Sequence, residues 1–465
     1  MAKGGKAKKK RVPMREQDVR VRIHNFRSVP LGYSEEEVIK EAERCLQCKN
    51  PKCELNCPVN LKIRDTLQSI IERDFEKAFF VAKEDNPIPA ITGRVCPQED
   101  QCEGACVVGK VGDAINIGKL IAFVADWARE KGIEEEVKIY ERPEKVAVIG
   151  SGPAGICCAN DLRKAGFQVI IFEALHLPGG VLTYGIPAFR LPKDVVNYEL
   201  DFIQKMGVKI QLNTIVGQNV SFGELQKEFD AIFIGTGAGA PIFMGIEGEK
   251  LMGVYSANEF LIRVNLMRAY EFPEWDTPIV CGERVGVIGA GNVAMDSARS
   301  ALRLGAKEVH ILYRRTKQYS PARAEELTHA LEEGIIFHEL VNPVRILGDD
   351  KGWVKGIELV RMELGEPDAS GRPRPQPIKG SEFTMELDTV IEALGTRPNR
   401  LFLSRAEGLD IYPWGGIKAD ENMMTNIEGV FVGGDAVSGA ATVIRALGDG
   451  RKAAQAIYNY LSTKH

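Results

Sequence analysis

One stretch constrains the fold of this chain more than any other: residues 144–173, EKVAVIGSGPAGICCANDLRKAGFQVIIFE. The apolar run over residues 147–149 is typical of a buried parallel strand, and it turns through GSGPAG into a helical pattern. A second apolar run follows and ends on Glu173. A G-x-G-x-x-G turn between a strand and a helix, with an acid about 20 residues further on, indicates a dinucleotide-binding unit.

Each glycine of this motif has a physical reason. The first allows the tight turn, the second lets a pyrophosphate approach the backbone, and the third allows close packing of the helix on the strand. The N-terminus of the following helix supplies N–H donors and positive potential to the phosphates. The ionised Glu173 carboxylate only accepts hydrogen bonds, which suits a ribose with free hydroxyls. The alternative is a glycine-rich turn in another kind of α/β domain.

The composition limits the class of protein. A length of 465 residues suggests two to four domains, and 44% hydrophobic and 27% charged residues are ordinary for a globular protein. The net charge of −4 gives no general attraction to nucleic acid. No stretch approaches the ~18 apolar residues of a membrane span. We therefore expect a cytoplasmic protein that binds neither nucleic acid nor membranes.

The N-terminus is strongly basic. Residues 1–15 carry seven lysines and arginines and no acid. A signal peptide would need an apolar segment next, and none follows. The segment is therefore expected to be a solvated, disordered tail.

Cysteine usage is the most unusual property of the composition. Seven of the ten cysteines fall in two runs: Cys45, Cys48, Cys53 and Cys57, then Cys96, Cys102 and Cys106. In a reducing compartment such a concentration indicates metal or iron–sulfur ligation rather than disulfides. The first run, CLQCKNPKCELNCP, has the spacing of bacterial ferredoxins stretched by two residues, with the terminal Cys-Pro kept.

In two-cluster ferredoxins the fourth cysteine of such a run ligates the other cluster. By this logic the first three cysteines share one cluster with a cysteine of the second run, and Cys57 joins the remaining two. Zinc ribbons are the alternative, but they prefer paired C-x2-C knuckles, and this region has one such pair. The other three cysteines, Cys157, Cys158 and Cys281, are expected to be structural.

The ligand count is short by one. Two clusters with four ligands each need eight, and the region offers seven cysteines. A helix expected over residues 115–129 is well placed to cover a cluster, but its apolar stripe carries no thiol, carboxylate or amide. One cluster is therefore expected to be incomplete. Further helices are expected to open at the capping box Ser34–Glu37 and to span about residues 61–83.

A second dinucleotide unit follows. Residues 284–294, RVGVIGAGNVA, again place a glycine turn between a strand and a helix, with alanine as the permitted third residue. The next strand, expected over residues 309–313, ends on Arg314 and Arg315 rather than on an acid. An acid there selects NAD, whereas arginines suit the 2′-phosphate of NADP. As a solvated charge pair, the two arginines would carry no such meaning.

The chain repeats one plan, because each glycine-turn unit is followed by a strand that starts at an acid, Asp230 or Asp388, and ends in glycine. A last strand over residues 429–434 delivers Asp435 to a helix start. Asp435 is suited to an N-cap, but the two dinucleotide units favour a contact with flavin ribitol. Residues 178–193 lack the cysteine pair that many flavin disulfide reductases carry there, which argues against dithiol chemistry.

Several segments together resemble one family over almost the whole chain, from about Val12 onward. They are CLQCKNPKCELNCPV, ITGRVCPQEDQCEGACV, INIGKL, GSGPAG, GGVLTYGIPAFRLPK, GAGNVAMD, YRRT, EALGTRPN and GGDAVSGAATVIRALGDGRKA. The family comprises the small (beta) chain of glutamate synthase and its relatives. These include the N-terminal half of dihydropyrimidine dehydrogenase, the large subunit of NADH-dependent ferredoxin:NADP oxidoreductase and the alpha subunit of archaeal sulfide dehydrogenase. The last two appear most similar.

The resemblance implies an α/β fold with a helical two-cluster iron–sulfur domain, followed by an FAD-binding Rossmann-type domain with an inserted NADP-binding Rossmann-type domain. The bounds would be 1–15 for the basic tail, 16–140 for the iron–sulfur domain, 141–277 and 390–465 for the FAD domain, and 278–389 for the NADP(H) domain.

The resemblance also implies which residues meet each cofactor. One cluster would be held by Cys45, Cys48, Cys53 and Cys106, and the second, nearer the flavin, by Cys57, Cys96 and Cys102. FAD would contact Gly150, Gly152, Pro153, Ala154, Gly155, Glu173, Gly180, Val181, Arg190, Val216, Asp435, Thr442 and Val443. NADP(H) would contact Gly289, Ala290, Gly291, Asn292, Val293, Arg314, Arg315, Ala393, Leu394 and Gly395.

One position departs from the family. Relatives supply the eighth ligand as a Glu or Gln after the INIG-type motif, where this chain has Ile121, which cannot bind iron. The second cluster is therefore predicted to be 3Fe-4S, or to be completed by water or by a displaced acid such as Asp113.

The implied function is an oxidoreductase subunit that passes electrons between NADP(H), FAD and two clusters, with no catalytic acid, base or nucleophile from the protein. Its partner would be a smaller flavin/iron–sulfur subunit or ferredoxin. The alternative is a glutamate synthase small chain that supplies electrons to a large chain. A non-enzymatic iron–sulfur scaffold is a third reading, against which the intact glycines, Glu173 and Asp435 argue.

Overall fold

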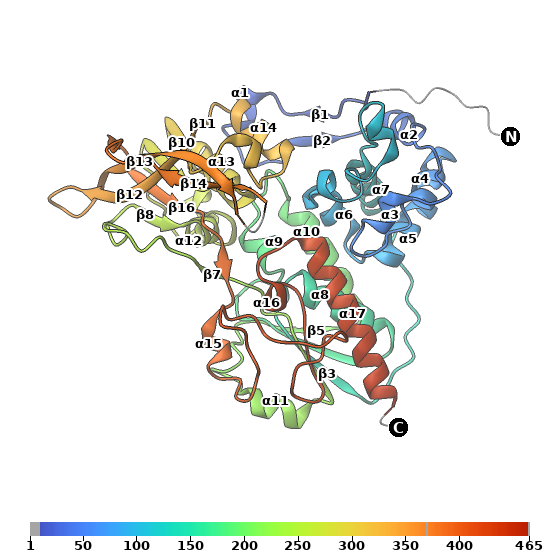
Figure 1. Cartoon of the computed structure of the whole chain (residues 1–465). Helices are drawn as coiled ribbons and strands as arrows, with labels where there is room; N and C mark the ends of the chain where they lie inside the picture. The colour runs from blue at the N-terminus through green and yellow to red at the C-terminus, as the bar shows by residue number, and fades with distance from the viewer. Residues whose placement is uncertain (1–9, 369–370, 464–465) are drawn as a thin grey trace.

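The computed structural model describes residues 10–368 and 371–463 and divides them into three parts (Figure 1). A helical part opens the chain, and two α/β parts each contain a five-stranded parallel sheet. The α/β fold class expected from the sequence is confirmed. Within the described residues, no helix has the length and apolar character needed to cross a membrane.

The N-terminal segment is docked on the protein from residue 11 onward. The Arg11 side chain donates to the Ala114 carbonyl and pairs with Glu103, and the Val12 N–H donates to the Glu41 carboxylate at 2.8 Å. The expectation of a disordered tail over residues 1–15 is therefore wrong for residues 11–15, where Arg11, Val12 and Arg15 have hydrogen-bond partners on the helical part. Residues 1–9 lie outside the described residues.

The helical part begins with two short strands and the helix between them. Its elements are β1 (Arg15–Glu16), α1 (Val19–Arg22), β2 (Pro30–Gly32), α2 (Glu35–Ala42), α3 (Lys52–Leu55), α4 (Ile63–Ile71), α5 (Phe75–Asp85), α6 (Pro89–Val95) and α7 (Ile117–Lys131). The capping box at α2 is confirmed, with Ser34 and Glu37 each accepting from the other's backbone N–H. The single helix expected over residues 61–83 is wrong. It divides into α4 and α5 because Arg73 is left-handed (φ 63°) and the Asp74 side chain caps α5.

The first sheet has the strand order β18-β6-β3-β4-β5. Its strands are β3 (Lys145–Ile149), β4 (Gln168–Phe172), β5 (Lys209–Gln211), β6 (Ala231–Ile234) and β18 (Val430–Val432). Its helices are α8 (Pro153–Lys164), α9 (Val181–Tyr184), α10 (Lys193–Lys205), α11 (Phe222–Glu228), α16 (Asp435–Ser438) and α17 (Val443–Ser462). The long α17 packs along α8, which follows the first glycine turn (Figure 1).

The second sheet has the order β11-β10-β9-β16-β8. It contains β8 (Val254–Ser256), β9 (Arg284–Ile288), β10 (Glu308–Tyr313), β11 (Ile336–Glu339) and β16 (Thr389–Glu392), with α12 (Ala257–Leu261), α13 (Asn292–Arg303) and α14 (Ala324–Glu332). Beside it lies an antiparallel unit of β12 (Val341–Gly348), β13 (Val354–Pro367), β14 (Pro373–Pro377) and β15 (Phe383–Met385). The expected bounds of 278–389 are too narrow for this part, because β8 pairs with β16 and β16 runs to Glu392.

The chain crosses between the two sheets twice, and the crossings pair with each other. β7 (Ala240–Pro241) leads away from the first sheet, β17 (Thr396–Arg397) leads back before α15 (Arg400–Leu403), and the two form an antiparallel ladder. The second α/β part is thus inserted into the first, as the family resemblance implied.

One hydrophobic core joins the helical part to the first sheet. Buried residues of α4 and α7, such as Leu67 and Leu120, belong to the same cluster as Ile156 of α8 and Leu447 of α17. The second sheet packs separate clusters on its own two faces. Since apolar burial is the dominant favourable term in folding, the helical part and the first sheet form one packed unit.

Candidate functional site

Four thiols of the helical part line one pocket: Cys45, Cys48, Cys53 and Cys106. They come from the loop after α2, from α3 and from the end of the second cysteine run. Burial raises the pKa of the Cys53 thiol to about 12, and repulsion from Cys45 and Cys106 adds to this. A bound metal ion would favour the thiolate form of these buried cysteines, because the cysteine ligands of a metal are deprotonated. The structure thus brings together three cysteines of the first run and one of the second.

The other three thiols of this region form a second group. Burial raises the pKa of Cys96, the neighbouring Cys57 raises it further, and the Arg323 guanidinium opposes both effects. Burial likewise raises the pKa of Cys102, with contributions from Glu103, Cys96 and Cys57. These three thiols are close enough to interact electrostatically.

The thiols lie too far apart for three of them to bind a single zinc ion as they stand. In a tetrahedral zinc site, Zn–S bonds of about 2.3 Å hold the sulfurs roughly 4 Å apart. Among the described residues, no three of these thiols lie within 4.8 Å of one another, and the one group that does consists of Glu16, His329 and Glu332. A cluster core separates its thiolates more widely, because each thiolate binds a different iron.

The second group lies against the first glycine turn through α17. A Cβ at Gly448 would come within 2.9 Å of the Pro58 carbonyl oxygen, so the Cys57–Pro58 dipeptide touches this helix. A Cβ at Gly450 would come within 2.2 Å of the Ala154 carbonyl oxygen, which belongs to the turn. Only glycine at positions 448 and 450 lets α17 pack this closely on Pro58 and on Ala154. Through α17, the second thiol group is therefore packed against the turn.

The position expected to lack a ligand is buried in α7. Ile121 of α7 is 3% exposed. A Cβ at Gly93 would come within 2.6 Å of the Ala122 N, so this segment of α7 packs closely on α6, directly before Cys96. Asp113, considered as a displaced ligand, is exposed and accepts from the Arg11 N–H at 3.1 Å.

Sequence reasoning missed a buried carboxylate, Glu103. Burial raises its pKa; Arg11 pairs with it, and the Gly118 N–H donates to it at 3.0 Å. It therefore holds the first turn of α7 beside the second thiol group. Its place directly after Cys102 was the available signal.

The first glycine turn has the geometry that its motif predicts. Gly150 has φ +99°, and a Cβ there would come within 2.5 Å of the Gly235 carbonyl oxygen. A Cβ at Gly155 would come within 2.0 Å of the Gly150 carbonyl oxygen, whereas a Cβ at Gly152 would meet nothing within 4 Å. The turn and the helix packing therefore exclude side chains, while Gly152 faces open space. Pro153 and Ala154 begin α8.

Glu173 follows β4 at the edge of this turn. Its carboxylate accepts from the Ser151 N–H and from the Leu175 N–H, both at 2.9 Å. Gly180 comes from the next loop, and a Cβ there would come within 2.8 Å of the Gly152 Cα. The structure thus gathers the turn, the acid and this loop, which continues into Val181 at the start of α9. Val216 is buried in the core on one face of the first sheet.

Asp435 lies where β18 ends and α16 begins. Burial raises the pKa of its carboxyl to about 6, and the Ala441 N–H donates to it at 3.1 Å. Thr442 caps α17 through the Arg445 N–H, and Val443 is the first residue of that helix. A half-buried carboxylate next to a helix N-terminus can accept hydrogen bonds from hydroxyl groups, such as those of a flavin ribitol.

The second glycine turn meets the turn that follows β16. Gly289 has φ +120°, and a Cβ there would come within 2.4 Å of the Ala393 carbonyl oxygen. Gly291 caps α13, followed by Asn292 and the exposed Val293. Leu394 and Gly395 continue the turn beside this motif, and the Gly395 carbonyl accepts from the Ile242 N–H.

The two arginines at the tip of β10 differ in environment. Arg315 is 4% exposed, pairs with Asp368 at 2.7 Å and donates to the Pro373 carbonyl. Arg314 is exposed. Of the two, Arg314 has the guanidinium that can reach a ligand phosphate.

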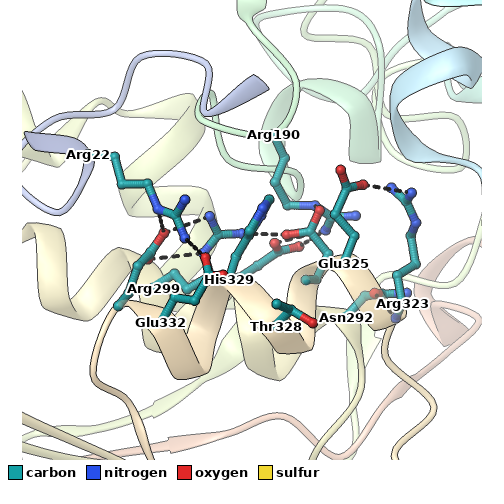
Figure 2. A network of polar contacts seen from close by, with 12 residues as sticks. Arg22, Arg190, Asn292, Arg299, Arg323, Glu325, Thr328, His329 and Glu332 are labelled. Atoms are coloured by element: carbon teal, nitrogen blue, oxygen red, sulfur yellow. Dashed lines mark hydrogen bonds and ion pairs between the residues drawn. The ribbon is translucent and has the colours of Figure 1, made fainter. Parts of the chain in front are cut away.

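Arg190 was expected at FAD, and the structure places its guanidinium between the two α/β parts (Figure 2). It pairs with Asp296 at 2.6 Å and with Glu326 at 2.8 Å. These two carboxylates already compensate the charge of Arg190. Its predicted contact with FAD stays a prediction.

The same network continues through the junction of all three parts (Figure 2). Its further ion pairs include Arg22–Glu332, Arg22–Glu333, Lys119–Glu325, Arg299–Glu326 and Arg323–Glu325. A cavity of about 530 Å³ lies beside it, with walls from the helical part and both α/β parts.

Comparison with known proteins matches two families. Residues 22–133 match the 4Fe-4S cluster domain II of dihydropyrimidine dehydrogenase, and residues 144–450 match the pyridine nucleotide-disulphide oxidoreductases. The chain is 37% identical over 459 residues to the glutamate synthase (NADPH) small chain of Escherichia coli, with 97% of each chain covered. It is 39% identical over 434 residues to the beta subunit of the NADP(+)-dependent formate dehydrogenase of Moorella thermoacetica, covering 88% of this chain and 60% of that one.

Solved structures resemble the α/β parts. FprA from Mycobacterium tuberculosis, in complex with NADPH, aligns with a TM-score of 0.58 and 22% identity over 69% of this chain and 85% of its own. Thioredoxin reductase from Lactococcus lactis aligns with a TM-score of 0.51 and 22% identity over 69% of this chain and 99% of its own. At this identity the likeness establishes the fold alone.

Proposed function

Since the chain belongs to the family of glutamate synthase small chains and related oxidoreductase subunits, we propose that it passes electrons between NADP(H), FAD and two iron–sulfur clusters, to or from a partner subunit. It is an NADP-dependent FAD oxidoreductase with a 4Fe-4S domain. The observation that carries the proposal is the division of seven thiols into a group of four and a group of three, the latter packed against the first glycine turn.

In this proposal the first glycine turn binds FAD and the second binds NADP(H). The helical part to about residue 140 is the iron–sulfur domain, and the crossing strands β7 and β17 bound the inserted NADP(H) domain. Glu173 and Asp435 accept hydrogen bonds from ribose and ribitol hydroxyls, and Arg314 receives the 2′-phosphate.

The cluster ligands follow from the two thiol groups. Cys45, Cys48, Cys53 and Cys106 hold one 4Fe-4S cluster. Cys57, Cys96 and Cys102 hold the second, nearer the flavin, which has three irons or takes a fourth ligand from outside the cysteines. The nearest part of α7 offers Ile121 there, and an alkyl side chain has no lone pair to donate.

The chemistry of the reaction belongs to the cofactors. FAD, when bound, links hydride transfer with NADP(H) to single-electron transfer with the clusters. The protein contributes position and environment. The glycine turns and helix N-termini bind pyrophosphate, the thiols bind iron, and the packing around Gly448 and Gly450 holds the second thiol group against the FAD turn. No side chain needs to act as acid, base or nucleophile.

Anaerobic purification with analysis of flavin and iron tests the proposal. The expected result is about one FAD and seven or eight irons per chain, with cluster signals in electron paramagnetic resonance (EPR) after reduction by NADPH. Cys48→Ala should remove the signal of one cluster and Cys96→Ala that of the other. Cys281→Ala, at a thiol outside both groups, is the matched control and should leave the iron content unchanged. A purified chain without FAD or iron would refute the proposal.

For the partner, we propose a smaller flavin/iron–sulfur subunit or a ferredoxin. The likeness to a glutamate synthase small chain over 97% of both chains favours a second candidate, in which the electrons go to a glutamate synthase large chain. Purification of the tagged chain from its own cells separates the two. A small NAD-binding flavoprotein supports the first, and a very large amidotransferase-bearing chain supports the second.

A further inference from the structure

Arg323 is fastened to the second glycine turn by its backbone. It lies directly before α14 and is 5% exposed. Its N–H donates to Asn292 Oδ1 at 3.0 Å, and Asn292 is the first residue of α13 (Figure 2). Three residues earlier, the Ser320 hydroxyl donates to the Ala290 carbonyl at 2.6 Å. The segment 320–323 is therefore attached at two points to the turn proposed to bind NADP(H).

The side chain of Arg323 reaches the helical part. One terminal guanidinium nitrogen donates to the Arg94 carbonyl at 2.7 Å, and the other donates to Gln98 Oε1 at 3.0 Å. Arg94 and Gln98 flank Cys96, two residues on either side. Gln98 is 4% exposed, and its amide donates to the Gly93 carbonyl of α6 at 3.1 Å. The guanidinium is thus hydrogen-bonded to the loop that carries Cys96, on both sides of this cysteine.

One donor of the guanidinium, the Nε N–H, is not used in these contacts. Its Nε is buried and forms no hydrogen bond within the part of the chain that the structure describes, with Glu99 3.7 Å away. The terminal nitrogen that donates to Gln98 also pairs with Glu325, at 2.9 Å. A buried cation with a free N–H, next to a cysteine, is the kind of neighbour that sets a cluster's potential, since hydrogen bonds and net charge both act on it.

We propose that Arg323 is a positioning residue that couples occupation of the NADP(H) site to the second iron–sulfur cluster. The inference rests on the proposed assignment of Cys57, Cys96 and Cys102 to that cluster. A pyrophosphate at the N-terminus of α13 fixes Asn292, and the contacts of Arg323 carry this constraint to the Cys96 loop. Because such coupling is reciprocal, reduction of the cluster changes the affinity for the nucleotide by the same factor.

The test separates the two ends of the contact. Arg323→Gln keeps the backbone N–H bond to Asn292 and removes the guanidinium. The probe is 2′-phospho-ADP-ribose, which has the pyrophosphate and the 2′-phosphate but no nicotinamide and so takes no electrons. In the full chain, the midpoint potential of the second cluster is measured by EPR with and without the probe. We expect the probe to shift the midpoint in the wild type and not in Arg323→Gln.

Arg129→Gln is the matched control. Arg129 also joins two parts of the molecule, through Asp194 at 2.8 Å, and its removal should leave the shift intact. A shift of equal size in the wild type and in Arg323→Gln would overturn the inference, and so would a second cluster that does not respond in the wild type. If the wild type gives no second-cluster signal, the cluster assignment fails and the inference with it.

The coupling has a second readout. The dissociation constant of the probe should differ between oxidised and reduced wild type, and the ratio should be one in Arg323→Gln. Should that variant lose iron, Arg323→Lys carries the test, because it keeps the charge and loses the paired contacts with Arg94 and Gln98. A wild-type ratio in Arg323→Lys would contradict the inference.

Discussion

Arg190 and Asp296 form a buried ion pair between two α/β parts that fold around separate sheets. Their charged groups are 2.6 Å apart, and the two side chains are 6% and 4% exposed. Glu326 approaches the same guanidinium at 2.8 Å from α14. One arginine of the first part thus pairs with two buried carboxylates of the second, of which Glu326 also pairs with Arg299. We expect the placement of the inserted domain to depend on it.

Arg190→Met should destabilise the protein strongly. Removing one partner of a buried ion pair costs about 3–5 kcal/mol, because the other charge, here that of Asp296, stays buried without its partner. Urea unfolding followed by circular dichroism measures this loss. The control is Arg263→Met, whose pair with Glu259 is exposed on the surface and should cost about 0–1 kcal/mol. Equal losses in the two variants would show that the Arg190 pair does not hold the parts together.

Arg314 and Arg315 should have different roles, the first in nucleotide binding and the second in stability. Arg314→Ala should raise the KM for NADPH about tenfold or more and leave that for NADH nearly unchanged, since a charge-assisted hydrogen bond is worth about 1.5–3 kcal/mol. Arg315→Ala should instead lower stability, because it removes the hydrogen bonds that this buried guanidinium donates to Asp368 and to the Pro373 carbonyl. Steady-state kinetics with both nucleotides provide the measurement. The assignment of the 2′-phosphate fails if Arg314→Ala affects NADPH and NADH alike.

Ile121→Glu should convert the second cluster toward four irons. A carboxylate at this buried position of α7 supplies the ligand that the seven cysteines leave open. Anaerobic EPR of the oxidised protein should lose a 3Fe-4S signal, and iron analysis should gain about one iron per chain. Leu120→Glu, at the preceding buried position, is the control and should only destabilise. Two ordinary 4Fe-4S signals in the wild type would contradict the three-iron version.

FAD binding should depend on pH through Asp435. Burial raises the pKa of this carboxyl from 3.8 to about 6 in the folded chain, so the folded FAD-free protein keeps a proton that the unfolded chain loses. Its stability should therefore fall as pH rises from about 4 to 6 and level off above that. Hydroxyl donors favour the ionised form, so FAD should bind about tenfold more weakly at pH 5 than at pH 8.

The measurement is the dissociation constant of FAD from flavin fluorescence at the two pH values. Asp435→Asn cannot ionise and should give similar constants at both, apart from effects of other groups. A wild type whose affinity does not change between these pH values would exclude Asp435 as a ribitol contact.

Local patterns made much of the fold predictable. The glycine turns at Gly150 and Gly289 were recognisable because a positive φ and a close backbone approach leave no alternative to glycine. The capping box at Ser34 is similarly local, since both of its hydrogen bonds lie within four residues. The break between α4 and α5 was missed because Arg73 adopts a left-handed conformation that its residue type rarely takes.

By itself, then, the sequence determined the two nucleotide-binding units and a seven-thiol region short of one ligand, because these depend on residue type and short-range spacing. Only the tertiary structure decided which arginine at the tip of β10 is exposed and which residue links Asn292 to the Cys96 loop. Those outcomes depend on burial and on charge partners far apart in the chain. Arg323 and Gln98 are 225 residues apart in sequence, and no local sequence pattern predicts their contact.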